Sequence, residues 1–271
     1  MRRNSIMEKK NRKYVFTKKL DAFFIGLLDA SRFVGLYFKE VFRGPFEFTE
    51  FKKQCYMMGI KSLPLITLTG LVTGIVFTKQ SRPSLQELGA VSWLPSLIAI
   101  ALIRALAPLI TSLISAGKIG SNIGAQLGSM RVTEQIDAMN VSGVNAFKYL
   151  VVTRVSASTV MIPILMMYFA FIGLIGSFIN VYIGENTSFV SYFQEAFSPI
   201  SFLDVLTGLF KSIAYGLTIG LVGSYKGYNA SRGTEGVGIA ANQAVVISMF
   251  LIFVEEIIIV QISGWIRLAQ F

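Results

Sequence analysis

Long stretches without charged residues recur along the chain and form its most visible pattern. The clearest runs from Val155 to Gly184 and holds 30 uncharged residues, more than the roughly 20 apolar residues with which a helix crosses a bilayer. Because such stretches are too long for the strands of a soluble core, the pattern predicts an all-α integral membrane protein. We predict five membrane-spanning helices, over residues 61–79, 93–116, 155–184, 202–225 and 237–265.

The segment before the first predicted span has a different pattern. Over residues 20–42, large apolar side chains recur at helical spacing, while Asp29, Arg32 and Glu40 fall on another stripe. A helix with one apolar and one charged face is typical of the membrane interface, although packing against other protein remains an alternative. Gly44 and Pro45 are expected to end this helix. The predicted parts are a basic tail (1–19), an interfacial amphipathic region (20–60) and a transmembrane domain (61–271).

Composition agrees with a membrane protein and removes several kinds of chemistry. Apolar residues make up 53% of the chain and charged residues 15%, with a mean hydropathy of +0.61. There is no His, and Cys55 is the only Cys, which excludes Ser-His-Asp or Cys-His catalysis, His/Cys zinc sites and intramolecular disulfides. We therefore expect no catalytic residues, no metal and no cofactor on this chain.

Positive charge is concentrated at the front of the chain. Residues 1–19 carry +7 of the net +10, which the positive-inside rule favours on the cytoplasmic side; a dedicated anionic-lipid site is the alternative. With five spans, the expected topology is N-in/C-out. The loops over 117–154 and 226–235 would then be cytoplasmic, and they hold more Lys and Arg than those near 79–92 and 183–200.

Four glycines lie three or four residues apart just after the second predicted span. On a helix this spacing gives one smooth face that permits close helix packing. A phosphate-binding role would need a GxxxxGK[ST] motif after a strand, and this order is missing here. The glycines are Gly117, Gly120, Gly124 and Gly128.

A short polar helix is predicted directly downstream, over residues 132–139. Ile136 falls on its apolar face, and Thr133 is expected to cap its start. Such a helix suits docking into another protein, while an ordinary solvated loop helix remains the alternative. Its polar residues are Glu134, Gln135 and Asp137.

These stretches resemble the MlaE/YrbE family of ABC-transporter permeases. The matching segments are RALAP (104–108), AGKIG (116–120), LGSMRVTEQIDAM (127–139), YLVVTR (149–154), YGLTIGLVGSYKGY (215–228), GTEGVG (233–238) and AVVIS (244–248). Two ordered blocks at family spacing are far more specific than one motif, and the likeness covers roughly residues 40–265.

The resemblance implies a permease that moves phospholipid or a related lipid and itself hydrolyses nothing. It implies an ABC ATPase subunit that couples to the helix around Glu134, Gln135 and Asp137. It also implies a second permease copy (homodimer or close paralogue), an MCE-domain lipid-binding partner and no nucleic acid. The expected location is a bacterial inner membrane or, alternatively, a plastid inner envelope. A channel or secondary carrier that needs no ATPase is the competing hypothesis.

The chain departs from the family pattern at three positions. Ala105 and Gln126 stand where acidic residues are usual, and Ala107 stands for a glycine. Because an unpaired charge in a bilayer is costly, Arg104 needs a partner or water. We expect Glu255 or Glu256 in the last span to pair with it, with all three lining the pathway; separate snorkelling to the interfaces is the alternative.

Overall fold

The computed structural model describes residue 21 and residues 24–268, and none of these residues forms a strand. They fall into two compact units, one ending at Phe46 and one beginning at Glu47. The first unit contains a helix over residues 24–41. Several of its large apolar side chains are exposed, including Phe24, Leu27 and Leu28. The interfacial position of this helix, and the predicted domain bounds at residues 19 and 60, stay predictions.

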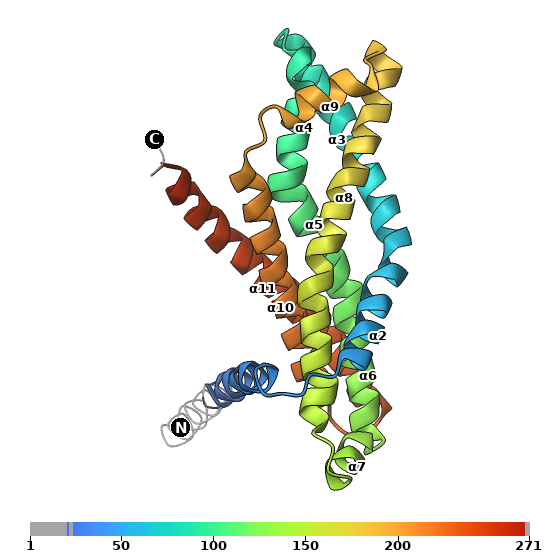
Figure 1. Cartoon of the computed structure of the whole chain (residues 1–271), viewed down its shortest axis with the longest axis vertical. Coiled ribbons are helices and arrows are strands. Elements are labelled where there is room, and N and C mark those ends of the chain that lie inside the picture. The colour runs from blue at the N-terminus through green and yellow to red at the C-terminus, as the bar shows by residue number, and fades with distance from the viewer. Residues whose placement is uncertain (1–20, 22–23, 269–271) are drawn as a thin grey trace, which may run out of the picture. The chain divides into compact units, whose positions relative to one another are not determined.

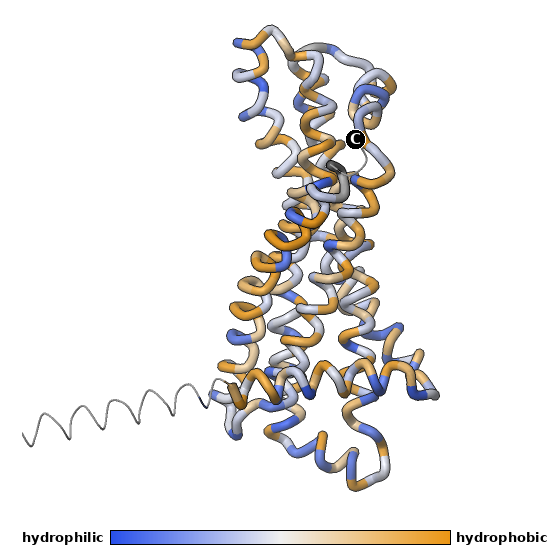
Figure 2. The backbone as a smooth tube through the Cα atoms, turned by 90° about the vertical axis from the view of Figure 1, so that its left-hand side faces the viewer, coloured by the Kyte–Doolittle hydropathy of each residue, from blue (hydrophilic) through white to orange (hydrophobic). Residues whose placement is uncertain are grey.

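The second unit contains five helical segments long and apolar enough to cross a membrane, which confirms the predicted count. They are Phe48–Glu87, Val91–Val132, Phe147–Gly184, Phe202–Tyr228 and Thr234–Trp265. Figure 2 shows that the middle parts of these segments are mainly hydrophobic and that hydrophilic residues gather toward their ends. The N-in/C-out orientation stays a prediction.

The first two spans are interrupted, whereas the last two are continuous helices. The first is built from α2 (Phe48–Met58), a 3-10 turn η1 (Ile60–Ser62) and α3 (Leu63–Glu87). The second comprises η2 (Val91–Trp93), α4 (Leu94–Ala101), η3 (Leu102–Leu106), α5 (Ala107–Ser115), η4 (Ala116–Gly120) and α6 (Ser121–Val132). The remaining elements are α7 (Gln135–Val141), η5 (Phe147–Val152), α8 (Thr153–Glu185), α9 (Phe189–Phe197), α10 (Phe202–Tyr228) and α11 (Thr234–Leu268).

Three of the interruptions are π-helical turns, namely η3, η4 and η5. A π-turn widens the helix locally and is common at functional sites. Basic side chains lie in or beside these turns: Arg104 in η3, Lys118 in η4 and Arg154 just after η5. Each of these cations makes a contact with a different span.

Two short helices lie at opposite ends of the bundle (Figure 1). Helix α7 connects the second and third spans, and α9 lies between the third and fourth. Around α9, Phe178, Phe189, Tyr192 and Phe193 form an aromatic cluster, with ring centroids 4.6–6.4 Å apart. Burial inside this cluster raises the pKa of Tyr192 to about 12, so the phenol stays neutral at physiological pH.

The core forms where glycines let backbones approach across helices. A Cβ on Gly74 of α3 would overlap the carbonyl oxygen of Gly173 in α8. On Gly216 of α10, a Cβ would lie 2.7 Å from the Ser158 carbonyl oxygen and 2.9 Å from the Thr159 Cα. Close backbone packing replaces the hydrophobic effect as the source of helix association in lipid. The third span is therefore the centre of the bundle, flanked by α3 and α10.

We predict that Gly216→Ala destabilises the protein by about 1–3 kcal/mol, because the added methyl group meets backbone atoms that cannot move alone. The measurement is the thermal midpoint of the purified protein in mild detergent. Gly238→Ala is the matched control, because a Cβ there meets nothing within 4 Å and alanine favours the helix by up to about 1 kcal/mol. Equal midpoints for the two variants would contradict the packing argument.

Candidate functional site

Arg104 in η3 forms an ion pair with Asp204 at the start of α10. Arg104 Nε lies 2.7 Å from Oδ1 of Asp204, and Nη2 donates to Oδ2 at 2.8 Å. Oδ2 also accepts from the backbone N–H of Ser201 at 3.0 Å, which completes a capping box at the α10 N-terminus. One buried carboxylate thus begins the fourth span and neutralises a cation of the second.

Lys211, about two turns further along α10, connects three spans. Its Nζ lies 2.6 Å from Oε1 of Glu256 in α11 and also donates to the carbonyl oxygen of Arg104 at 3.2 Å. The hydroxyl of Tyr215 donates to the other oxygen of Glu256. The Lys211 side chain is 3% exposed and that of Glu256 16%, so both charges depend on this contact.

Glu255 is bound differently from its neighbour Glu256. Its Oε1 accepts from the Thr218 hydroxyl, while its Oε2 is buried and has no hydrogen-bond partner among the described residues. No described cation forms an ion pair with it. Within a single copy of the chain, the Glu255 carboxylate therefore has fewer polar contacts than that of Glu256.

The expected pairing of Arg104 with Glu255 or Glu256 is wrong, because Asp204 takes Arg104 and Lys211 takes Glu256. Sequence reasoning missed the role of Asp204. Its position three residues after Ser201 is a recognisable capping signal. Its contact with Arg104, across 100 residues of sequence, has no such signal. Whether Arg104, Glu255 and Glu256 line the pathway stays a prediction.

The short polar helix forms at the end of α6, as α7. Ile136 is buried, whereas Thr133, Glu134, Gln135 and Asp137 are exposed. Arg131 at the end of α6 lies 2.6 Å from Asp137 across the turn, and Glu134 adopts a left-handed conformation with φ of 59°. The end of α6 and the following α7, here called the α7 hairpin, thus present an ordered polar surface that the apolar side chain of Ile136 anchors.

The expected capping of this helix by Thr133 is wrong. Thr133 is the last residue of the preceding turn, and its hydroxyl donates to the Ser129 carbonyl oxygen at 2.8 Å. Glu134 occupies the N-cap position and makes no side-chain cap hydrogen bond. The Ser129 carbonyl oxygen, which also accepts the backbone N–H of Thr133 at 3.0 Å, competes successfully for the threonine hydroxyl.

The four glycines predicted to follow the second span lie within it, in η4 and α6, and they face α10 and α11 to different degrees. Gly124 is the tightest, since a Cβ there would lie 3.1 Å from the Cα of Ala241 in α11. At Gly120 and Gly128 the nearest atoms would be 3.5 and 3.4 Å away, and at Gly117 3.9 Å. Close approach to α11 is therefore centred on Gly124.

An apolar groove lies between α10 and the C-terminal part of α11, which diverges from α10 (Figure 1). Its volume is about 550 Å³. The Lys211–Glu256 pair is adjacent to the lining in sequence, since Lys211 follows Phe210 and Glu256 lies one turn before Ile259. Apart from Thr207 and Ser263, the lining is wholly apolar. It consists of Leu203, Leu206, Thr207, Leu209, Phe210, Ile213, Ile259, Ile262 and Ser263.

We predict that Lys211→Met costs about 3–5 kcal/mol, because it leaves Glu256 buried without its cation. The double variant Lys211→Met/Glu256→Gln should recover most of this loss, as the uncompensated charge is gone. Thermal midpoints in detergent measure both effects, with the exposed Lys79→Met as the control. Additive losses in the double variant would show that the two side chains are not energetically coupled.

Comparison with known proteins identifies the family. The family model described as "Permease MlaE" matches residues 51–262. A probable ABC transporter permease protein of Rickettsia bellii is 33% identical over 82% of this chain and 86% of its own length. Corresponding proteins of Synechocystis sp. and Porphyra purpurea (ycf63) are 32% and 35% identical, over 88% and 72% of this chain and 90% and 74% of their own lengths. The chain is a multi-pass membrane protein that belongs to the MlaE permease family.

Proposed function

We propose that this permease subunit moves phospholipid or a related lipid within an ATP-binding-cassette transporter. The observation that carries the proposal is the groove between α10 and α11. Its volume of about 550 Å³ and nearly unbroken apolar lining suit an acyl chain, which binds by burial of apolar surface without specific polar contacts. An ion pathway would instead need rings of carbonyls or charged side chains along its length.

ATP hydrolysis belongs in this proposal to a partner chain that docks on α7. Exposed Glu134, Gln135 and Asp137 offer polar and anionic contacts on a hairpin held in shape by Ile136 and the Arg131–Asp137 pair. With N-in/C-out topology, α7 lies on the cytoplasmic side, where an ATPase subunit finds ATP. The hairpin extends directly from α6, so a movement imposed on it reaches the second span without a flexible linker.

A second permease copy and an MCE-domain lipid-binding protein complete the proposed assembly. Helix α11 is the least enclosed span. Of the residues in its most apolar 18-residue stretch, 11% are buried, compared with 56% in the third span. Exposed residues such as Phe250 and Ile257 on this helix form an uncovered apolar surface, against which another copy and lipid would pack and close the groove. The membrane is a bacterial inner membrane, with the plastid inner envelope as the alternative that the ycf63 relatives support.

Reversing the charge of Glu134 tests the docking surface. We predict that Glu134→Lys removes the ATPase subunit from the tagged, detergent-purified complex, because an exposed anionic contact becomes repulsive. Mass spectrometry of the co-purifying chains is the measurement. Glu87→Lys is the matched control, since it makes the same change at an exposed position at the opposite end of the bundle.

Two results would contradict this assignment. Retention of the ATPase by Glu134→Lys would move docking away from α7. Recovery of the wild-type chain alone, under conditions that preserve other membrane complexes, would favour the channel or carrier that works without an ATPase.

Filling the groove tests the lipid. We predict that Leu206→Trp lowers the amount of phospholipid that co-purifies with the protein, because the indole occupies the space of an acyl chain. Lipid extracted from equal amounts of protein is quantified by mass spectrometry. Ile164→Trp is the control, because Ile164 and Leu206 are similarly exposed, at 51% and 49%, but Ile164 does not line the groove. Equal losses in both variants would assign the lipid to the general surface.

A further inference from the structure

Arg154 is a buried cation with no carboxylate bound to it. It lies at the start of α8, just after η5, and only 2% of its surface is exposed. None of the ion pairs between described residues includes it. An arginine in such a place has lost most of its hydration, and a buried charge without a counter-charge is normally strongly destabilising.

The contacts of its guanidinium group are with neutral acceptors. Nη1 donates to the Leu150 carbonyl oxygen of its own helix at 3.0 Å, and Nη2 donates to Oε1 of Gln126 in α6 at 3.4 Å. Nε has no hydrogen-bond partner among the described residues. Among the described residues, the one polar link from Arg154 to α6 is thus a long hydrogen bond to a neutral acceptor.

A buried carboxylate of α2 contributes a balancing charge. Glu50 is also buried, and its carboxylate acts on Arg154 through space without touching it. Gln54 donates to Glu50 at 2.7 Å, and the hydroxyl of Tyr149, in the turn before Arg154, donates to it at 3.5 Å. Glu50 is therefore held in place by α2 and η5. Its Oε2 also lies 3.8 Å from Nζ of Lys53, whose side chain is 72% exposed, so water screens that pair while the buried Arg154 shares the same carboxylate charge.

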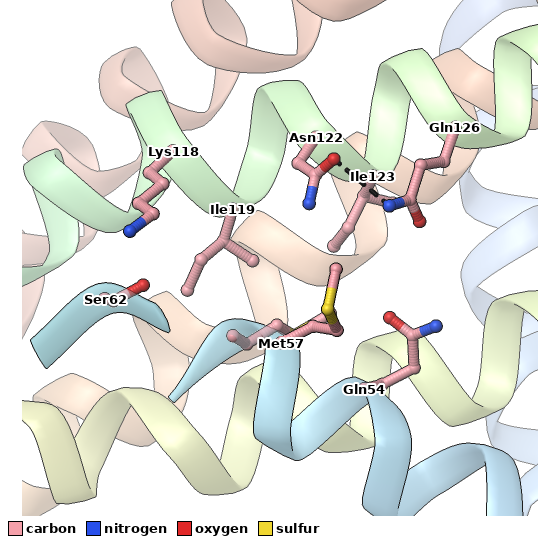
Figure 3. A pocket seen from close by; sticks show the side chains of 9 residues that line it. Gln54, Met57, Ser62, Lys118, Ile119, Asn122, Ile123 and Gln126 are labelled. Atoms are coloured by element: carbon pink, nitrogen blue, oxygen red, sulfur yellow. Dashed lines mark hydrogen bonds between the residues drawn. The ribbon is translucent and has the colours of Figure 1, made fainter. Parts of the chain in front are cut away.

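A small pocket separates α2 from α6 at this level. Figure 3 shows Gln54 on one wall and Gln126 on the other. The amide nitrogen of Gln126 donates to Oδ1 of Asn122 at 3.2 Å. The lining also includes Ser62, whose hydroxyl has no hydrogen-bond partner among the described residues. The α6 wall of the pocket is therefore held to α8 and α2 by few polar contacts.

We propose that Arg154 is a positioning residue that holds α6, and with it the α7 hairpin, through one releasable hydrogen bond to the uncharged side chain of Gln126, while Glu50 balances its charge from α2. The inference rests on the proposed function, in which α7 receives the movement of an ATPase. When α6 moves away, Arg154 loses one weak hydrogen bond and keeps its counter-charge. A carboxylate at position 126 would instead tie α6 to Arg154 by a charged, low-dielectric contact that is expensive to break.

Gln126→Glu tests this directly, with two readouts. The thermal midpoint of the purified permease should rise by about 2–6 °C, because the buried cation gains a bound anion. ATP turnover by the complex purified with its ATPase should fall about tenfold, equivalent to holding α6 about 1.4 kcal/mol more tightly. Gln80→Glu is the matched control, since it makes the same substitution at an exposed position of α3, away from Arg154 and Gln126.

A second pair of variants tests the part played by Glu50. Glu50→Gln should lower the thermal midpoint, because it removes the balancing charge while keeping an acceptor for Gln54 and Tyr149. Adding Gln126→Glu to this variant should restore the midpoint to about the wild-type value, since the cation regains one anion. Losses that do not recover in the double variant would overturn the charge balance.

The outcomes separate this inference from the proposed function. The thermal midpoints need no ATPase, so an unchanged or lowered midpoint for Gln126→Glu overturns the inference even if the transporter assignment holds. A raised midpoint with unchanged ATP turnover would leave Arg154 a purely structural residue and overturn its positioning role. If no ATPase co-purifies with the wild-type chain, the proposed function fails and the positioning role fails with it, whereas the midpoints still decide whether Glu50 balances Arg154.

Discussion

The ion pair between Lys211 and Glu256 is the interaction on which the packing of the second, fourth and fifth spans depends. In a medium that cannot hydrate charges, each side chain requires the other, so α10 and α11 are joined at this level. Lys211 also binds the Arg104 carbonyl oxygen in the π-turn η3, which adds the second span to the same junction. Arg104 and Asp204 then join the second span to the start of α10. Four charges in total are satisfied between three spans.

This junction explains where the groove begins. Toward the N-terminus of α11, the helix packs closely on α6 and α10, as the contact of Gly124 with Ala241 shows. Beyond Glu256 no described polar contact of this kind holds α11 to α10, and the two helices diverge. An apolar cavity between them is stable because lipid, or a further copy of the chain, can cover it. The unpartnered oxygen of Glu255 lies near the same point.

At the opposite end of the bundle, the polar contacts are weaker. Arg154 reaches α6 only through Gln126, and Arg131 meets Asp137 on the exposed α7 hairpin. Between these ends, α6 and α10 are in close contact: a Cβ on Gly227 would lie 2.8 Å from the Gly124 carbonyl oxygen, and one on Gly223 3.1 Å from that of Gly120. The second span thus connects the α7 hairpin to the ion pairs of Arg104 and Lys211. Near α7, close glycine packing holds it to α10 and α11, while its polar contacts are few.

The sequence by itself determined the five spans, the short helix after the second span and the need of Arg104 for a partner, because these follow from local hydrophobicity, periodicity and the cost of a charge in lipid. Thr133 shows the limit of local reasoning, since its hydroxyl had two acceptors in reach and bound the Ser129 carbonyl oxygen. Only the tertiary structure decided that Asp204 is the partner of Arg104, that Lys211 takes Glu256, and that backbones approach closely at Gly74 and Gly216. Those pairings depend on which helices are neighbours and on their relative heights. No local pattern encodes either, because the charged partners lie 45 and 100 residues apart in the sequence.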